Sequence, residues 1–269
     1  MDDRLHVGKQ NTNKVLWICV NILNIARSLD NLSFEINMLA KNGSINAARV
    51  DRSKGQMMVP LVGGLSDISL QIRTEIDLLK TECINLSRKI SLCSVCTRRH
   101  YQYKKSLICS LNRLHGKHQN ADPGPGEESQ MIELFTSKKS NTADSLASWV
   151  EDKLSDQIEE VEQINMESVA RKSDDSQNQF RLFTQESIRI IQAAIKRLER
   201  IEKIRLTAKY VASYISINVA YLETGADRFH GLVENINIIV QQLDEQQQAL
   251  IHYAEQGQRL LQTMLSQRN

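Results

Sequence analysis

The chain has 269 residues, of which 41% are hydrophobic, 25% are charged and 5% are aromatic. This balance excludes a globally disordered chain, and the content of three prolines and eleven glycines argues against a turn-rich β-sandwich or barrel. The net charge of +2 is unevenly spread, because residues 1–118 carry 18 Lys and Arg against 9 Asp and Glu, whereas the remainder carries 16 against 23. We therefore expect the halves to attract each other. Because the basic residues form no stripe with aromatic residues, we expect no nucleic-acid binding.

The N-terminus is polar, and the first apolar patch, VLWICVNIL at 15–23, is too short for a secretory signal or a membrane span. Five cysteines, an odd number without the spacing of a small disulfide scaffold, are typical of a reducing compartment. The sequence therefore predicts a cytoplasmic protein with no membrane span.

Apolar residues recur at alternating spacings of three and four along four stretches, which predicts helices packed in coiled-coil or bundle geometry. The first stretch predicts a helix over about 12–50, and its apolar series is Val15, Ile18, Ile22, Ile25, Leu29, Leu32, Ile36 and Leu39. The second predicts a helix over about 57–117. Because only the segment VDRSKGQ at 50–56 separates them, these two helices must run antiparallel as a hairpin.

The next segment, HGKHQNADPGPGEESQ, is rich in Pro, Gly and acidic residues and predicts a flexible linker at 118–141. An amphipathic helix is predicted over about 142–172. A polar break at 173–179, within the run RKSDDSQNQ that begins at residue 171, then interrupts the apolar series. Two further long helices flank the short turn ETGAD, so a second hairpin with its tip near 223–227 is predicted. The expected division is thus a first hairpin at 1–117, a linker, and a second region at 142–269.

These elements predict an all-α fold in which two long antiparallel hairpins form a four-helix bundle. The two hairpins can pair within one chain, which would be a monomeric pseudo-dimer, or each can pair with a second chain in a homodimer. The opposite charges of the two halves favour the internal pairing, although exposed ion pairs are individually weak.

The first hairpin carries the run FEINMLAKNGSINAAR at 34–49, directly before its turn. This run resembles the tip of the methyl-accepting chemotaxis receptor (chemoreceptor) signalling domain, whose pattern is approximately FxxNxLALNAAIEAAR. The second hairpin has a fainter echo in GADRFHGLVENI at 225–236, where the family has a turn glycine followed by GRGF. The chain therefore resembles a divergent, duplicated chemoreceptor hairpin, in which one polypeptide imitates a bundle that receptors build from two subunits.

The resemblance implies a cytoplasmic signalling bundle that binds a histidine kinase and its coupling adaptor through the hairpin tip, with no cofactor required. Small residues would then supply a smooth contact face, and larger ones would supply anchors. The small residues are Ala40, Ala47 and Ala48, and the anchors are Phe34 and Arg49. The other tip residues that match the family pattern are Asn37, Leu39, Asn42, Arg228 and Phe229.

The run CSVCTRRH places Cys93, Cys96 and His100 at spacings of three, four and seven on the second helix. These spacings put the three side chains on one side of a helix, so they can converge on a metal ion or a haem, or act as a redox sensor. The run is not CxxCH, so covalent haem attachment is not indicated. The alternative is that the cysteines are small core residues and His100 caps an exposed part of the helix.

Enzyme motifs are absent from the sequence: it has no phosphate-binding glycine loop, no nucleophile turn and no pair of carboxylates with a histidine. We therefore expect a protein that is not an enzyme. Three functions stay open at this point: a chemoreceptor-like signalling protein, a metal, haem or redox sensor, and a non-catalytic structural scaffold.

Overall fold

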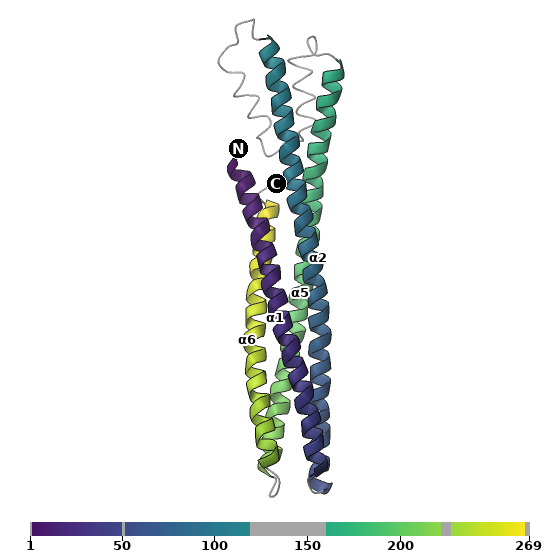
Figure 1. The fold of residues 1–269 in the computed structure, drawn as a ribbon, viewed down its shortest axis with the longest axis vertical. Coiled ribbons are helices and arrows are strands. Elements are labelled where there is room, and N and C mark those ends of the chain that lie inside the picture. The colour runs from purple at the N-terminus through teal and green to yellow at the C-terminus, as the bar shows by residue number, and fades with distance from the viewer. Residues whose placement is uncertain (1, 50–51, 119–159, 222–226, 267–269) are drawn as a thin grey trace. The chain divides into compact units, whose positions relative to one another are not determined.

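A computed structural model describes residues 2–49, 52–118, 160–221 and 227–266. Four long helices account for nearly all of them: α1 (Asp2–Arg49), α2 (Arg52–His118), α5 (Glu160–Ala220) and α6 (Asp227–Ser266) (Figure 1). These ranges contain no β-strand, so the predicted all-α helical bundle is confirmed. No described helix combines the length and the apolar character that crossing a membrane requires.

The chain divides into two compact units, and every helix contributes a segment to each. Unit 1 comprises Met1–Val15, Arg88–Ile188 and Leu260–Asn269, and unit 2 comprises Leu16–Ser87 and Arg189–Arg259. The units therefore do not coincide with the two hairpins, because helices of both hairpins pack together within each unit. Residues 119–141 of the predicted linker lie outside the described residues.

In unit 2 the helices contact one another in the cyclic order α1, α2, α5, α6. The α1–α2 contact is fixed by a reciprocal pair, in which Ser33 Oγ donates to the Ser69 carbonyl at 2.9 Å and Ser69 Oγ donates to the Ser33 carbonyl at 2.8 Å. Ion pairs connect α2 with α5 and α5 with α6. The ring of Trp17 on α1 packs edge-on against Tyr253 on α6, with centroids 5.7 Å apart.

Small residues bring α1 close to its neighbours in unit 2. They recur every seven residues on the buried side of the helix: Ala26, Ser33, Ala40 and Ala47. The sequence predicts Ile25 and Leu39 in the core, but both are only half-buried, and the core runs through the residue that follows each of them. A small side chain lets two helix backbones approach, so the larger neighbour is displaced to the flank.

Three helix boundaries differ from those predicted. α1 begins at Asp2, well before residue 12, and α2 begins at Arg52, so most of the expected turn at 50–56 is helical. Pro60 lies inside α2 and is exposed. α5 runs without interruption through 173–179, where the sequence predicts a break, because this run has no Gly or Pro and its buried residues Ser173 and Ser176 continue the core series to Phe180. Residues 142–159 of the amphipathic helix lie outside the described residues.

Candidate functional site

The predicted cluster of Cys93, Cys96 and His100 lies on α2 in unit 1, facing α5. Cys93 Sγ lies 3.6 Å from Thr184 Oγ1, and Cys96 Sγ donates to Gln179 Oε1 at 3.8 Å. His100 Nδ1 lies 2.9 Å from both the carbonyl and the hydroxyl oxygen of Ser173. Each of the three side chains therefore contacts its own polar group on α5.

This arrangement does not support a metal centre. In the described part of the chain, no three His, Cys, Asp or Glu side chains come close enough together to hold a metal ion. Sharing one side of a helix did not bring the sulfurs and the imidazole to a common point, because successive turns of α2 face successive turns of α5. The described residues therefore bring no three metal ligands together at Cys93, Cys96 and His100, whose two cysteines are buried, and the haem or redox role of this cluster stays a prediction.

The predicted contact tip is only partly exposed. Phe34, Asn42, Ala48 and Arg49 are exposed, and Asn37 and Leu39 are half-buried. By contrast, Ala40, Ala47 and Phe229 are buried in the core of unit 2 and are not part of its exposed surface. The close helix packing described above, which needs small residues inside the bundle, accounts for the two alanines, whereas Phe229 is one of the largest fully buried side chains. The side chain of Arg228 lies outside the described part of the chain.

Large apolar side chains nevertheless reach solvent on both helices of the first hairpin. Phe34 and Leu70 directly follow the paired serines and are 63% and 66% exposed. Further exposed residues continue from them towards the C-terminus of α1 and the N-terminus of α2. We call this set the α1–α2 patch: Phe34, Met38, Ile45, Val59 and Leu70.

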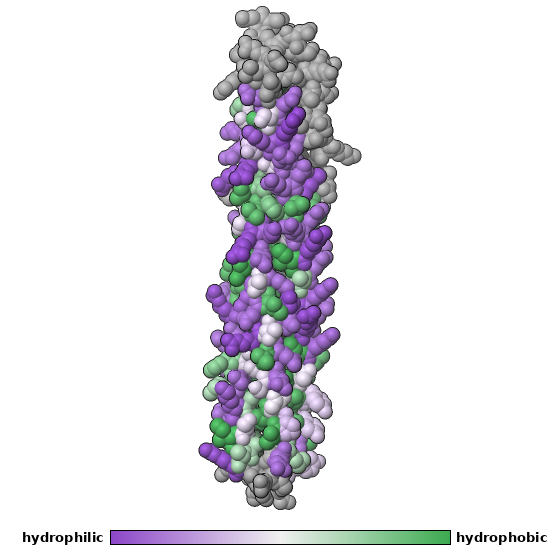
Figure 2. All heavy atoms as spheres, turned by 90° about the vertical axis from the view of Figure 1, so that its right-hand side faces the viewer, coloured by the Kyte–Doolittle hydropathy of each residue, from purple (hydrophilic) through white to green (hydrophobic). Residues whose placement is uncertain are grey.

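Charged residues are sparse around this patch. Residues 31–72 contain seven Asp, Glu, Lys or Arg, about two-thirds of what the chain average of 25% would give. In Figure 2, green and pale atoms are frequent in the lower part of the view, while purple atoms are more frequent above it. Exposed apolar surface with few charges is typical of protein contacts.

A second exposed series, on α5, has no counterpart among the predicted site residues. It comprises Leu206, Tyr210, Tyr214, Ile217 and Tyr221, which we call the α5 stripe. The rings of Tyr210 and Tyr214 stack with centroids 6.1 Å apart. The signal was present in the sequence, since these residues recur at helical spacings beside the core series of the same helix, and three of the six tyrosines of the chain belong to it.

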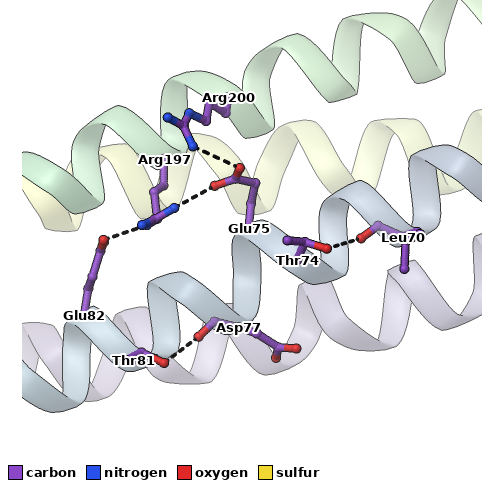
Figure 3. A network of polar contacts seen from close by, with 8 residues as sticks. All are labelled: Leu70, Thr74, Glu75, Asp77, Thr81, Glu82, Arg197 and Arg200. Carbon is purple, nitrogen blue, oxygen red and sulfur yellow. Dashed lines mark hydrogen bonds and ion pairs between the residues drawn. The ribbon is translucent and has the colours of Figure 1, made fainter.

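A network of ion pairs crosses from α2 to α5 in the middle of unit 2 (Figure 3). The guanidinium of Arg197 bonds Glu82 at 2.6 Å and Glu75 at 3.2 Å, and Arg200 contacts Glu75 at 3.4 Å. The bond with Glu82 raises the pKa of Arg197, which stays cationic. The carboxylates come from the basic half of the chain and the guanidinium groups from the acidic half. Local pairing, not the net charge of each half, therefore joins the hairpins here.

Arg205 and Lys80 form further ion pairs in unit 2. Arg205 bonds Glu202 at 2.6 Å within α5 and Asp244 of α6 at 3.2 Å. The bond from Arg205 lowers the pKa of Glu202. Between α2 and α1, the ammonium group of Lys80 contacts the carboxylate of Asp30 at 2.9 Å. Together with the network of Figure 3, these contacts fix the axial register of the four helices.

The buried cysteines of unit 2 are not suited to redox or nucleophilic chemistry. Burial raises the pKa of Cys83, and it raises that of Cys19 despite a hydrogen bond with Ser87. Both are therefore neutral thiols at physiological pH, and the reactive species of cysteine is the thiolate. Cys109 of unit 1 is exposed, whereas the other four cysteines are buried.

Searches of the chain against protein-family models, curated proteins and solved structures found no match in any of the three.

Proposed function

We propose that the protein is a non-enzymatic, cytoplasmic signalling bundle of the chemoreceptor type, which binds a histidine kinase and its coupling adaptor through the α1–α2 patch. The proposal rests on one observation: five large apolar side chains stand in solvent on the hairpin whose sequence resembles the receptor tip. A protein without a partner gains nothing from exposing such a cluster, which lowers its solubility.

Phe34 and Leu70 have the properties of binding anchors. They protrude beside the reciprocal serine pair, which holds the two helix backbones together beneath them. A rigid support reduces the conformational entropy that binding costs, so more of the apolar contact appears as affinity. Arg49, exposed in the last turn of α1, adds a positive charge at the rim of the patch.

The test is a binding titration of the purified full chain with a histidine kinase and coupling adaptor from the same cell. Replacing Phe34 with Ala should weaken binding by about thirtyfold, which corresponds to a hot-spot loss of roughly 2 kcal/mol. Leu182→Ala is a matched control, because Leu182 is similarly exposed but lies on α5 outside both the α1–α2 patch and the α5 stripe.

Two results would remove the proposal. One is the absence of saturable binding to both the kinase and the adaptor, which would leave a structural scaffold as the better description. The other is binding that Phe34→Ala and Leu70→Ala leave unchanged, since contact would then occur elsewhere on the chain. Circular dichroism of each variant checks that the helices are intact.

A further inference from the structure

The α5 stripe is the most extensive apolar series on one helix face that the described residues leave in solvent. Its members are exposed by 51% (Leu206), 69% (Tyr210), 45% (Tyr214), 54% (Ile217) and 80% (Tyr221). Lys209 is the only charged residue between positions 206 and 221, and it lies to one side of the stripe. The face therefore offers apolar and hydroxyl groups with almost no charge to match on a partner.

The spacing of the stripe is the same in both directions along the chain. With the exposed Ser213 included, the positions 206, 210, 213, 214, 217 and 221 are separated by steps of 4, 3, 1, 3 and 4. A second α5 laid antiparallel on this face, with a twofold axis between residues 213 and 214, meets it in register. Leu206 then faces Tyr221 of the second copy, Tyr210 faces Ile217, and Ser213 faces Tyr214, so a large side chain meets a smaller one in each pair.

The exposed area agrees with a weak specific dimer. At about 200 Å² for each such side chain, the exposed fractions correspond to roughly 600 Å² per chain. Two copies would bury about 1,200 Å², which is the lower limit for a specific protein interface. An uncharged stripe also pairs with itself without repulsion, whereas a charged face would require a different, complementary partner.

From these observations we infer that the α5 stripe is a self-association surface, through which two copies of the chain form an antiparallel dimer with twofold symmetry. Tyrosine suits this role because it covers a large area with few rotatable bonds and keeps its hydroxyl in water at the rim. The inference is independent of the proposed kinase contact, which uses the α1–α2 patch on the other hairpin.

Sedimentation equilibrium of the full chain over a range of micromolar concentrations measures the dimer directly. The native chain should show a monomer–dimer equilibrium, and Tyr210→Glu should weaken it by at least about tenfold because it buries a charge in each half of the contact. Phe34→Glu is the matched control, because it places the same charge at a similarly exposed aromatic position of α1. This control should leave the dimer unchanged while it abolishes kinase binding, so the two proposals fail separately.

Cysteine cross-linking tests the antiparallel geometry. In a background with the exposed Cys109 replaced by Ser, Ser213→Cys should form a disulfide-linked dimer on mild oxidation, because residue 213 lies next to the twofold axis. Ile217→Cys alone should not, but a mixture of Ile217→Cys with Tyr210→Cys should.

A chain that stays monomeric at all concentrations would overturn the inference. So would cross-linking of Ile217→Cys to itself, which requires a parallel pair, or a dimer that is sensitive to Phe34→Glu and insensitive to Tyr210→Glu.

Discussion

Unit 1 and unit 2 bury different kinds of side chain. Among the described residues, seven buried polar side chains belong to unit 1 and three belong to unit 2. Those of unit 1 are Asn11, Thr12, Thr97, Ser173, Ser176, Thr184 and Ser187, and those of unit 2 are Ser33, Ser69 and Gln247. The difference is not one of helix content, because segments of the same four helices form both units.

The hydrogen bonds of these groups differ in what they connect. Thr97 and Ser187 each donate to the carbonyl four residues earlier in their own helix, and Thr184 does the same while its hydroxyl also lies 3.6 Å from the thiol of Cys93 on α2. Ser33 and Ser69 instead bond across two helices. Unit 2 also has ion pairs across three of its helix contacts. Unit 1 joins α2 to α5 through thiol contacts, the bond between His100 and Ser173, and the ion pair of Lys89 with Glu186. Because thiol contacts are weak and the ion pairs of unit 2 span three helix contacts, we expect unit 1 to open at the lower free energy.

The comparison of the two units is tested most strongly by replacing one buried leucine in each unit with alanine. Leu79→Ala in unit 2 should lower the free energy of unfolding by about 2–5 kcal/mol, because a fully buried side chain is lost and a cavity remains. Leu107→Ala in unit 1, at an equally buried site, should mainly increase local opening. Urea denaturation gives the first quantity and hydrogen exchange resolved by segment gives the second. Equal loss of exchange protection throughout the chain in both variants would contradict the distinction.

The ion-pair network of Figure 3 provides the next test. Arg197→Ala should lower the free energy of unfolding by about 2 kcal/mol, because it leaves the largely buried carboxylates of Glu75 and Glu82 without their shared cation. Arg200→Ala removes a neighbouring but mostly exposed guanidinium and should cost less than about 0.5 kcal/mol. Urea denaturation of both variants measures the difference. Similar losses for the two would mean that the network contributes only general charge attraction.

The sequence was sufficient for the fold because its periodic apolar residues and its scarcity of Gly and Pro both specify long helices. It was insufficient where two residue types are equally compatible with the pattern. Leu39 and Ala40 both follow the apolar series, and only the close approach of α1 to α2 decides that the alanine is buried. Ala47 and Phe229 were assigned to the contact tip by the resemblance to the receptor pattern, which does not tell which side of a helix is buried.

The site was less predictable than the fold because it depends on what lies opposite each side chain. Cys93 and His100 share one side of α2, but their partners Thr184 and Ser173 on α5 lie 91 and 73 residues away in sequence, beyond the reach of a spacing rule. The α5 stripe was visible as a helical series. An apolar series does not by itself tell which side of the helix is buried, and Leu206 and Ala208 become distinguishable only once the neighbouring helices are placed.

The reciprocal serine pair should give a smaller effect. Ser33→Ala and Ser69→Ala should each cost about 1 kcal/mol, since each removes one cross-helix hydrogen bond from a buried contact. The double variant should lower the free energy of unfolding by less than the two single changes together, because the two hydroxyls also lie 3.3 Å apart and either single change already removes that contact. Ser187→Ala in unit 1 is the control. It should change the free energy of unfolding by less than about 0.5 kcal/mol, because the hydroxyl of Ser187 donates to the Phe183 carbonyl of its own helix. Strict additivity in the double-mutant cycle would show that the serines do not act as a pair.

The glycines of unit 2 allow the smallest test of how tightly its helices pack. A Cβ atom at Gly63 would meet nothing within 4 Å, so Gly63→Ala should stabilise the protein by about 0.5–1 kcal/mol through the higher helix propensity of alanine. At Gly43 the same atom would lie 3.0 Å from Val62 and 3.2 Å from Leu232. There the gain in propensity is opposed by overpacking, because the stiff, buried valine cannot turn away. The melting temperature should therefore rise for Gly63→Ala and rise less, or fall, for Gly43→Ala. An equal rise for both would indicate that α1 and α2 can separate slightly at no cost, and the tight register assigned to unit 2 would not extend to the end of the bundle near residue 50.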